Sequence, residues 1–171
     1  LWREALPQAT FTNLYGPTEG TGMCYYYRVN RDFTDGEPIP IGRPFPNREI
    51  LLFTPENTLA APGEEGEICI RGTSVTLGYY NDLERTAQAF VQNPLNHAYP
   101  EILYRTGDIG RYNHRGELVF VSRKDHQIKH MGHRIELGEI EANVAMLPEI
   151  KLCACTYDEQ RAKIVLYYVG D

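Results

Sequence analysis

Short apolar segments separated by turns make up most of the first 124 residues. Residues 67–71 alternate polar and apolar side chains, as a strand with one buried face does. Residues 49–54 form an apolar run between proline-containing stretches, which also favours a strand. The pattern predicts strands at residues 10–14, 49–54, 67–71, 103–108 and 117–122. The last two flank a turn and are expected to form a β-hairpin.

One helix is predicted within this β-rich region, over residues 81–90. The Asn-Asp pair at its start supplies an N-cap, and Leu83, Ala87 and Phe90 repeat on one face. A polar connection over residues 91–102 is expected to follow the helix.

The pattern changes after Asp125. Two short segments around Gly132 predict a small hairpin, and a helix with Ile140, Val144 and Leu147 on one side follows it. The elements expected here are strands at 127–130 and 133–136, a helix at 137–147, and strands at 150–156 and 163–169. We therefore place a domain boundary near Asp125, with residues 1–124 in one domain and residues 125–171 at the truncated beginning of a second.

Composition narrows the function classes. The chain has 171 residues, is 42% hydrophobic and carries 17 basic against 23 acidic residues, a net charge of −6. This balance does not favour a nucleic-acid partner, because phosphate binding calls for a basic surface. No apolar run approaches the ~20 residues that cross a bilayer, and the N-terminus lacks the features of a signal peptide. We expect no nucleic-acid partner and no membrane partner.

The four cysteines, Cys24, Cys69, Cys153 and Cys155, form no CxxC pair and sit among apolar or aromatic neighbours. They are predicted to be small buried hydrophobic residues rather than ligands. With no secretion signal, the reducing cytoplasm is the expected compartment.

Four stretches combine turn glycines with polar groups: NLYGPTEG (13–20), YRTGD (104–108), SRKDHQIKHMGHR (122–134) and IELGEIE (135–141). Each alone has an ordinary structural explanation. An aspartate after Thr-Gly can hydrogen-bond nearby backbone, and glutamates at a helix start stabilise the positive end of its dipole.

Together and in this order, the motifs NLYGPTE, GEICIRGTSVTLGYY, YRTGD and RKDHQIKHMGHRIELGEIE resemble those of the adenylate-forming superfamily, the AMP-binding ligases. The resemblance is greatest to the amino-acid-activating branch, which comprises adenylation domains of non-ribosomal peptide synthetases and D-alanine:carrier-protein ligases. It implies a β-rich α+β fold: the distorted β-barrel and sheet portion of the large N-terminal domain, followed by the start of a small, mobile α+β C-terminal domain.

The resemblance also implies a two-step reaction. A carboxylate, here an amino acid or another small carboxylic acid, attacks the α-phosphate of ATP to give an acyl-adenylate and pyrophosphate. The phosphopantetheine thiol of an acyl or peptidyl carrier protein then captures the acyl group. Mg²⁺ is the expected metal, because a hard carboxylate oxygen is the ligand type that it prefers.

The resemblance assigns site residues one by one. Thr18 and Glu19 match the catalytic pair, with the hydroxyl on phosphate oxygens and Glu19 as the magnesium ligand. Asp108 matches the aspartate that accepts both ribose hydroxyls, which suits an acceptor-only carboxylate. The expected nucleotide-binding residues are Asn13 at the adenine edge, Tyr15 beside the nucleotide, Asp108, Phe120 against the adenine, and Arg123 on ribose or phosphate.

Substrate and partner residues follow from the same resemblance. Leu14, Gly22 and Met23 match the positions that line the side-chain pocket, and they suggest an uncharged side chain. Asp125 matches the hinge between the domains. Gly132 matches the loop that turns toward the pantetheine arm, where a glycine lets the backbone pass close to a ligand.

Two departures from the family pattern concern the region around the hinge. Ser122-Arg123 stands where Gly-Arg is usual, and His130-Met131 stands where an apolar residue and an arginine are more common. The histidines at 126, 130 and 133 invite a zinc interpretation, but on the expected hairpin they share no face with carboxylate or thiolate partners.

Two alternatives remain open. An acyl- or aryl-CoA ligase of the same superfamily would match the adenylation residues equally and differ in acid and acceptor. A non-catalytic binding module is the alternative from another class, because basic residues and histidines between positions 123 and 134 suggest an RNA-binding loop. The acidic total and the lack of interleaved exposed aromatic residues argue against it.

The resemblance predicts that this chain alone does not catalyse adenylation. The family's Gly/Ser/Thr-rich phosphate loop and its late lysine are both expected outside the 171 residues. We expect no exchange of pyrophosphate into ATP when the chain is incubated with ATP, Mg²⁺ and a panel of amino acids. Robust exchange would contradict this placement of the catalytic groups.

Overall fold

The computed structural model describes residues 2–125 and 127–170, and it divides into two compact units between Lys124 and Asp125. The first unit contains α1 (Trp2–Ala5), β1 (Thr12–Tyr15), a 3₁₀ helix (Thr18–Gly20), β2 (Tyr25–Arg28), β3 (Arg43–Pro44), β4 (Arg48–Phe53), β5 (Glu65–Gly72), α2 (Leu83–Ala89), β6 (Phe90–Gln92), β7 (Ile102–Tyr112) and β8 (Leu118–Arg123). The second contains β9 (Gln127–His130), β10 (His133–Glu136), α3 (Leu137–Val144), β11 (Ile150–Asp158) and β12 (Lys163–Gly170).

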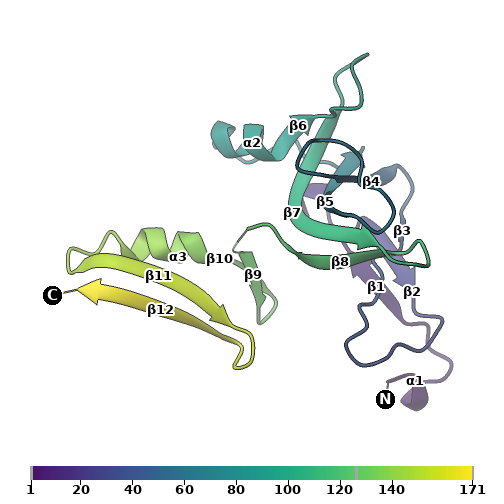
Figure 1. Cartoon of the computed structure of the whole chain (residues 1–171), viewed down its shortest axis with the longest axis horizontal. Helices are drawn as coiled ribbons and strands as arrows, with labels where there is room; N and C mark the ends of the chain where they lie inside the picture. The colour runs from purple at the N-terminus through teal and green to yellow at the C-terminus, as the bar shows by residue number, and fades with distance from the viewer. Residues whose placement is uncertain (1, 126, 171) are drawn as a thin grey trace. The chain divides into compact units, whose positions relative to one another are not determined.

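Strand β7 is the centre of the first unit. It has 11 residues, and Figure 1 shows it as a long curved strand. One edge pairs with β5, which in turn pairs with β4. The other edge pairs first with β6 and then with β8, and all these pairings are antiparallel. One strand therefore joins four others into a single sheet.

Two irregularities bend this sheet. Between β5 and β7, Glu67 lies opposite Ile109 while Cys69 lies opposite Arg105, so residues 106–108 together face a single residue of β5. Between β7 and β8, Ile109 lies opposite Ser122 and Gly110 opposite Phe120, which leaves the residue at 121 extra. Bulges of this kind increase strand bending and twist, which accounts for the curvature of β7.

The main core lies on one face of the five-stranded sheet and includes residues of the β1–β2–β3 sheet. Ile68 and Ile70 of β5 point into this cluster and are fully buried, whereas Cys69 between them points to a smaller cluster with Phe53 and Leu103. This follows from the alternation of side chains along a strand. Both faces of β5 are thus buried.

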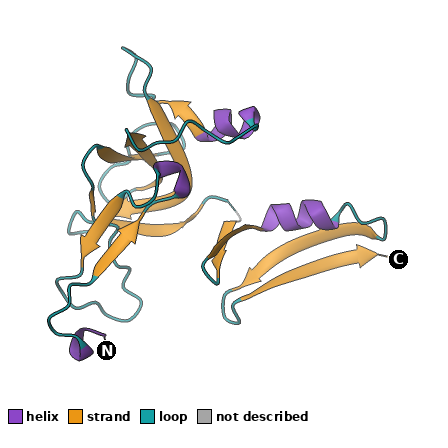
Figure 2. Cartoon of the chain, turned by 180° about the vertical axis from the view of Figure 1, so that it is seen from behind, coloured by secondary structure: helices purple, strands orange, loops and turns teal. Residues whose placement is uncertain are grey.

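The second unit contains a tight hairpin and a layer of helix on sheet. Strands β9 and β10 are joined by Met131 and Gly132, both with positive φ, as a two-residue type I′ turn requires. Figure 2 shows α3 along the β11–β12 hairpin. Glu141 of α3 accepts a 2.6 Å hydrogen bond from the backbone N–H of Cys155, so a polar contact joins the two layers.

The β-rich α+β fold is confirmed, as are the predicted hairpins that became β7–β8 and β9–β10. The predicted face of α2 is only partly buried: Phe90 is buried but lies in β6, whereas Leu83 is 85% exposed and Ala87 is also exposed. The helix instead turns Thr86 inward, where its hydroxyl accepts a hydrogen bond from the backbone N–H of Tyr79. Strand β6 follows α2 without a break, and it takes up the last residue of the predicted helix and the first two of the predicted polar connection.

The other corrections are smaller. Helix α3 ends at Val144, and Leu147 is 52% exposed. Three of the four cysteines are buried and Cys153 is half-buried. Within the described residues, no helix is long and apolar enough to span a membrane.

The position of Ile68 at the centre of the core predicts a large effect of truncation. Ile68→Ala should lower the free energy of unfolding by about 2–5 kcal/mol, because it leaves a cavity in a packed cluster. Leu77→Ala is the control, since Leu77 is fully exposed and such changes stay within about 0.5 kcal/mol. Urea unfolding of both variants measures the difference, and equal effects would contradict the packing described above.

Candidate functional site

The segment NLYGPTEG runs from β1 into the 3₁₀ helix Thr18–Gly20. Pro17 precedes this helix in an extended conformation, and the helix ends at Thr21 in the left-handed region. The turn leaves Thr18 exposed and buries Glu19, which retains 7% of its accessible surface. A hydroxyl at the surface is thus placed next to a buried carboxylate.

Three hydrogen bonds join this turn to residues 74–79 of the next motif. The Thr21 hydroxyl donates to the carbonyl oxygen of Ser74 at 2.6 Å. The backbone N–H of Thr76 donates to the carbonyl oxygen of Glu19 at 2.9 Å. The Tyr79 hydroxyl donates to Oε1 of Glu19 at 2.6 Å. Two motifs about 50 residues apart in sequence therefore form one local structure.

A second buried carboxylate, Asp108, lies on β7 between two partners. The Tyr15 hydroxyl donates to its Oδ2 at 2.6 Å, and the Arg123 guanidinium donates to its Oδ1. Arg123 also donates to the carbonyl oxygen of Thr106 at 3.1 Å. The register of β7 and β8 places Arg123 directly opposite Asp108, so the ion pair is a cross-strand pair on one face of the sheet.

The bulge at residues 106–108 sets the orientation of Asp108. Gly107 has a φ of 74°, a conformation that glycine adopts without steric cost. The Thr106 hydroxyl donates to the carbonyl oxygen of Ile68 at 2.7 Å and accepts from the backbone N–H of Asp108 at 3.0 Å. The backbone N–H of Gly107 donates to Oε1 of Glu67 at 3.2 Å. The backbone N–H groups of Gly107 and Asp108 thus donate to side-chain oxygens of Glu67 and Thr106.

Burial and charge affect the protonation of Tyr15. The pKa of its phenol is raised well above the ordinary value, chiefly by burial and next by the negative charge of Asp108. The hydroxyl therefore keeps its proton at neutral pH and remains a donor to Asp108.

Phe120 and Asn13 are the remaining predicted nucleotide-binding residues. Phe120 lies opposite Gly110, and Arg123 lies opposite Asp108. Because Gly110 and Asp108 are two positions apart on β7, they share a face of the sheet. The register shift in β8 therefore places Phe120 and Arg123 on that same face. Phe120 is 43% exposed. Asn13 donates to the carbonyl oxygen of Pro40 at 2.9 Å, so its side chain already has a structural role.

The predicted pocket residues are accessible. Leu14 and Met23 are each about half exposed, and Gly22 has open space around its α-carbon. Leu14 and Tyr15 are consecutive on β1 and therefore point to opposite faces. The strand thus separates the pocket position from the tyrosine that contacts Asp108.

The remaining predicted site residues, Asp125 and Gly132, belong to the second unit. Oδ1 of Asp125 accepts a hydrogen bond from the backbone N–H of Gln127 at 3.2 Å, and Gly132 lies in the tight turn between β9 and β10. His130 and His133 are opposite each other there, and His126 lies outside the described residues. Among residues that the structure describes, no group of three or more His, Cys, Asp or Glu could hold a metal ion.

A cavity of about 320 Å³ lies on the face of the sheet opposite Asp108. It is lined by Phe53, Glu67, Arg105 and Lys124, among others. Glu67 is nearly buried there and pairs with Arg105 at 2.8 Å. Glu67 also accepts the hydrogen bond from the backbone N–H of Gly107, so this ion pair contacts the bulge.

Sequence reasoning missed three supporting residues: Glu67, Tyr79 and Thr106. All three lie within motifs that the sequence made conspicuous, namely GEICIRG, LGYY and YRTGD. Burial of their polar atoms was the missing information, because it depends on long-range pairing.

Comparisons with known proteins identify the family. Residues 1–80 match the family described as AMP-binding enzyme. The chain is 38% identical to tyrocidine synthase 2 of Brevibacillus parabrevis across 99% of its own length, and 38% identical to bacitracin synthase 1 of Bacillus licheniformis across 92%. It spans 5% and 3% of those two proteins.

Two solved structures are similar along nearly the whole chain. PA1221, a non-ribosomal peptide synthetase protein containing adenylation and PCP domains, has a TM-score of 0.82 at 33% identity. IdnL1 has a TM-score of 0.87 at 31% identity. Each comparison covers 99% of this chain and about a third of the other. This chain therefore belongs to the AMP-binding enzyme family, as part of an adenylation domain of the non-ribosomal peptide synthetase type.

Proposed function

We propose that this chain forms part of the active site of an ATP-dependent ligase that activates an amino acid and loads it onto a carrier protein. In the first step a carboxylate oxygen attacks the α-phosphorus of ATP, and pyrophosphate leaves. In the second step a phosphopantetheine sulfur attacks the acyl carbon, and AMP leaves as the thioester forms. The observation that carries the proposal is Asp108, a nearly buried carboxylate held by Tyr15 and Arg123.

Asp108 is suited to bind the ribose diol. An ionised carboxylate accepts about four hydrogen bonds, and the Tyr15 hydroxyl and the Arg123 guanidinium use two of these positions. Two ribose hydroxyls can take the other two. Arg123, which is permanently charged, also places a positive charge where ribose and phosphate would lie.

Thr18 and Glu19 are suited to phosphate and magnesium. Both side chains offer oxygen atoms, and Mg²⁺ in nucleotide sites commonly takes one or two carboxylates together with substrate phosphates. Glu19 alone therefore fits as the protein ligand. When bound, the metal neutralises phosphate charge. Thr18, at the surface of the turn, contributes a hydroxyl to the phosphate oxygens.

Aromatic and apolar side chains complete the proposed assignment. Phe120, partly exposed on the same face as Asp108, offers a ring for stacking on adenine. Tyr15 lies beside the nucleotide, and Asn13 lies at the adenine edge. Leu14, Gly22 and Met23 contact the side chain of the acid, and an uncharged substrate side chain suits them.

Carrier transfer is assigned to the second unit. We assign residues 1–124 to the large AMP-binding domain and residues 125–171 to the small mobile one, with Asp125 as the hinge. Gly132, in an exposed turn with positive φ, is assigned to the pantetheine approach. The similarity to PA1221, whose chain contains adenylation and PCP domains, supports a carrier rather than coenzyme A as acceptor. We place the protein in the cytoplasm, where its free cysteines remain reduced.

Replacing Asp108 should weaken ATP binding. In a full-length ligase carrying this sequence, Asp108→Asn keeps the shape but loses acceptor capacity and charge, and the KM for ATP should rise by roughly ten- to a hundred-fold. Asp32→Asn is the control, because the Asp32 side chain is fully exposed. Pyrophosphate exchange at varied ATP measures both, and unchanged ATP kinetics in Asp108→Asn would mean that the ribose contact is misassigned.

Gly132 should matter for the second step alone. Gly132→Ala adds a methyl group at a φ of 83°, and thioester formation on a carrier domain should slow by about ten-fold through backbone strain and crowding. Pyrophosphate exchange should stay unchanged and serves as the internal control.

Free coenzyme A in place of the carrier tests the alternative acceptor. A ligase that transferred the acyl group to coenzyme A as fast as to the carrier domain would contradict the carrier assignment.

Equal losses of adenylation and of thioester formation in Gly132→Ala would contradict the role proposed for the turn.

A further inference from the structure

Tyr79 contacts the side chain of Glu19 from a segment 60 residues away. Its hydroxyl donates a 2.6 Å hydrogen bond to Oε1 of Glu19, a carboxylate with little solvent access. We propose that Tyr79 is a positioning residue that fixes the orientation of the Glu19 carboxylate for binding Mg²⁺ with ATP. The inference rests on the magnesium role given to Glu19 above.

A glutamate needs such a partner to act as a directional ligand. The last torsion of a glutamate side chain is broad, unlike its staggered sp³ torsions. A donor that is itself fixed selects one rotation of the carboxylate plane, because a hydrogen bond to a charged group is stronger than one between neutral groups. The main chain of Glu19 is held as well, since its carbonyl oxygen accepts from the N–H of Thr76.

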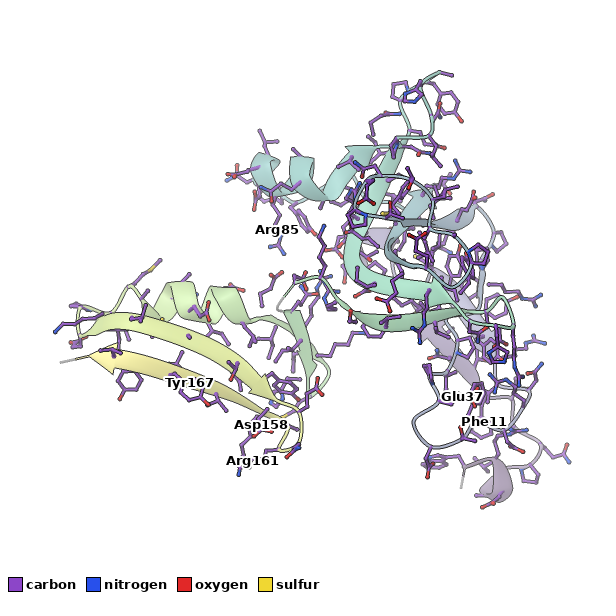
Figure 3. All side chains as sticks on the ribbon, in the orientation of Figure 1. Phe11, Glu37, Arg85, Asp158, Arg161 and Tyr167 are labelled. Carbon is purple, nitrogen blue, oxygen red and sulfur yellow. The ribbon has the colours of Figure 1, made fainter. Side chains whose placement is uncertain are left out.

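Tyr79 is fixed in turn by helix α2. Its backbone N–H donates to the Thr86 hydroxyl at 2.9 Å. Its ring meets the ring of Phe90 nearly edge to face, with centroids 5.6 Å apart. The Arg85 guanidinium, labelled in Figure 3, lies 4.6 Å from the Tyr79 ring centroid. The ring is therefore held at one edge and on one face.

Close packing at Gly78 brings Tyr79 and α2 together. A Cβ at this position would lie 2.4 Å from Cγ2 of Thr86, and φ is 132°. Only a glycine fits between the two elements. The Leu-Gly-Tyr-Tyr sequence thus has a physical reason: glycine allows the close approach, and the tyrosine after it reaches Glu19.

The chain supplies a matched control for Tyr79. Its neighbour Tyr80 is fully exposed, which provides a matched control of the same residue type in the adjacent position.

The test uses a full-length ligase carrying this sequence and Mn²⁺ as a spectroscopic probe for Mg²⁺. Free Mn²⁺ is measured by electron paramagnetic resonance in the presence of a non-hydrolysable ATP analogue. Tyr79→Phe should weaken Mn²⁺ binding by roughly ten-fold, whereas Tyr80→Phe should leave it unchanged. In a Glu19→Gln background, Tyr79→Phe should add no further loss, since the two residues act together.

The outcomes separate this inference from the function on which it rests. Weaker binding in Glu19→Gln with normal binding in Tyr79→Phe would overturn the positioning role and leave the magnesium role intact. Normal binding in Glu19→Gln would overturn the magnesium role itself. Equal losses in Tyr79→Phe and Tyr80→Phe would also overturn the inference.

A second variant guards against misfolding of Tyr79→Phe. Thr86→Ala removes the acceptor of the Tyr79 backbone N–H while keeping the phenol, and it should weaken Mn²⁺ binding by a few-fold. Its melting temperature is compared with that of Tyr80→Phe. Normal Mn²⁺ binding in a folded Thr86→Ala variant would contradict the dependence of Glu19 on α2.

Discussion

The hydrogen bond between the Tyr15 hydroxyl and Asp108 is the constraint on which the site depends. It is 2.6 Å long and joins residues 93 positions apart, one on the three-stranded sheet and the other on the five-stranded sheet. Arg123 completes the arrangement from the neighbouring strand β8. A carboxylate with so little access to water must be hydrogen-bonded, so Asp108 requires both sheets to be in place. Hydrogen bonds also orient the backbone that carries Asp108. They form within the bulge at residues 106–108 and between the bulge and the Glu67 carboxylate.

A second carboxylate repeats this pattern. Glu19 accepts from the Tyr79 hydroxyl at the same distance at which Asp108 accepts from Tyr15. Tyr15 and Glu19 come from one motif, and each is paired with a residue of another motif. The three motifs are therefore interlocked: NLYGPTE supplies a donor for Asp108 of YRTGD and receives a donor from LGYY. Neither carboxylate is therefore oriented by its own segment alone.

Sequence patterns predicted the elements better than the contacts. The hairpin of β7 and β8 and the hairpin around Gly132 follow from turn residues and apolar alternation, whereas Asp108 and Arg123 were singled out one by one through the family resemblance. Two features could not be predicted from the sequence. The bulges at residues 106–108 and at 121 decide which side chains share a face, and they change the strand period by an amount that local pattern does not encode. The inward orientation of the half-buried Thr86, in place of Leu83 and Ala87, depends on the close approach of Gly78, which is a tertiary contact.

The most direct measurement of the central claim compares ATP with its 2′-deoxy and 3′-deoxy analogues as substrates of a full-length ligase carrying this sequence. If Asp108 accepts both ribose hydroxyls, removing either one leaves a buried acceptor with one partner fewer. The KM of each analogue should exceed that of ATP by about ten-fold. Equal kinetics for ATP and both analogues would show that Asp108 does not accept the ribose hydroxyls.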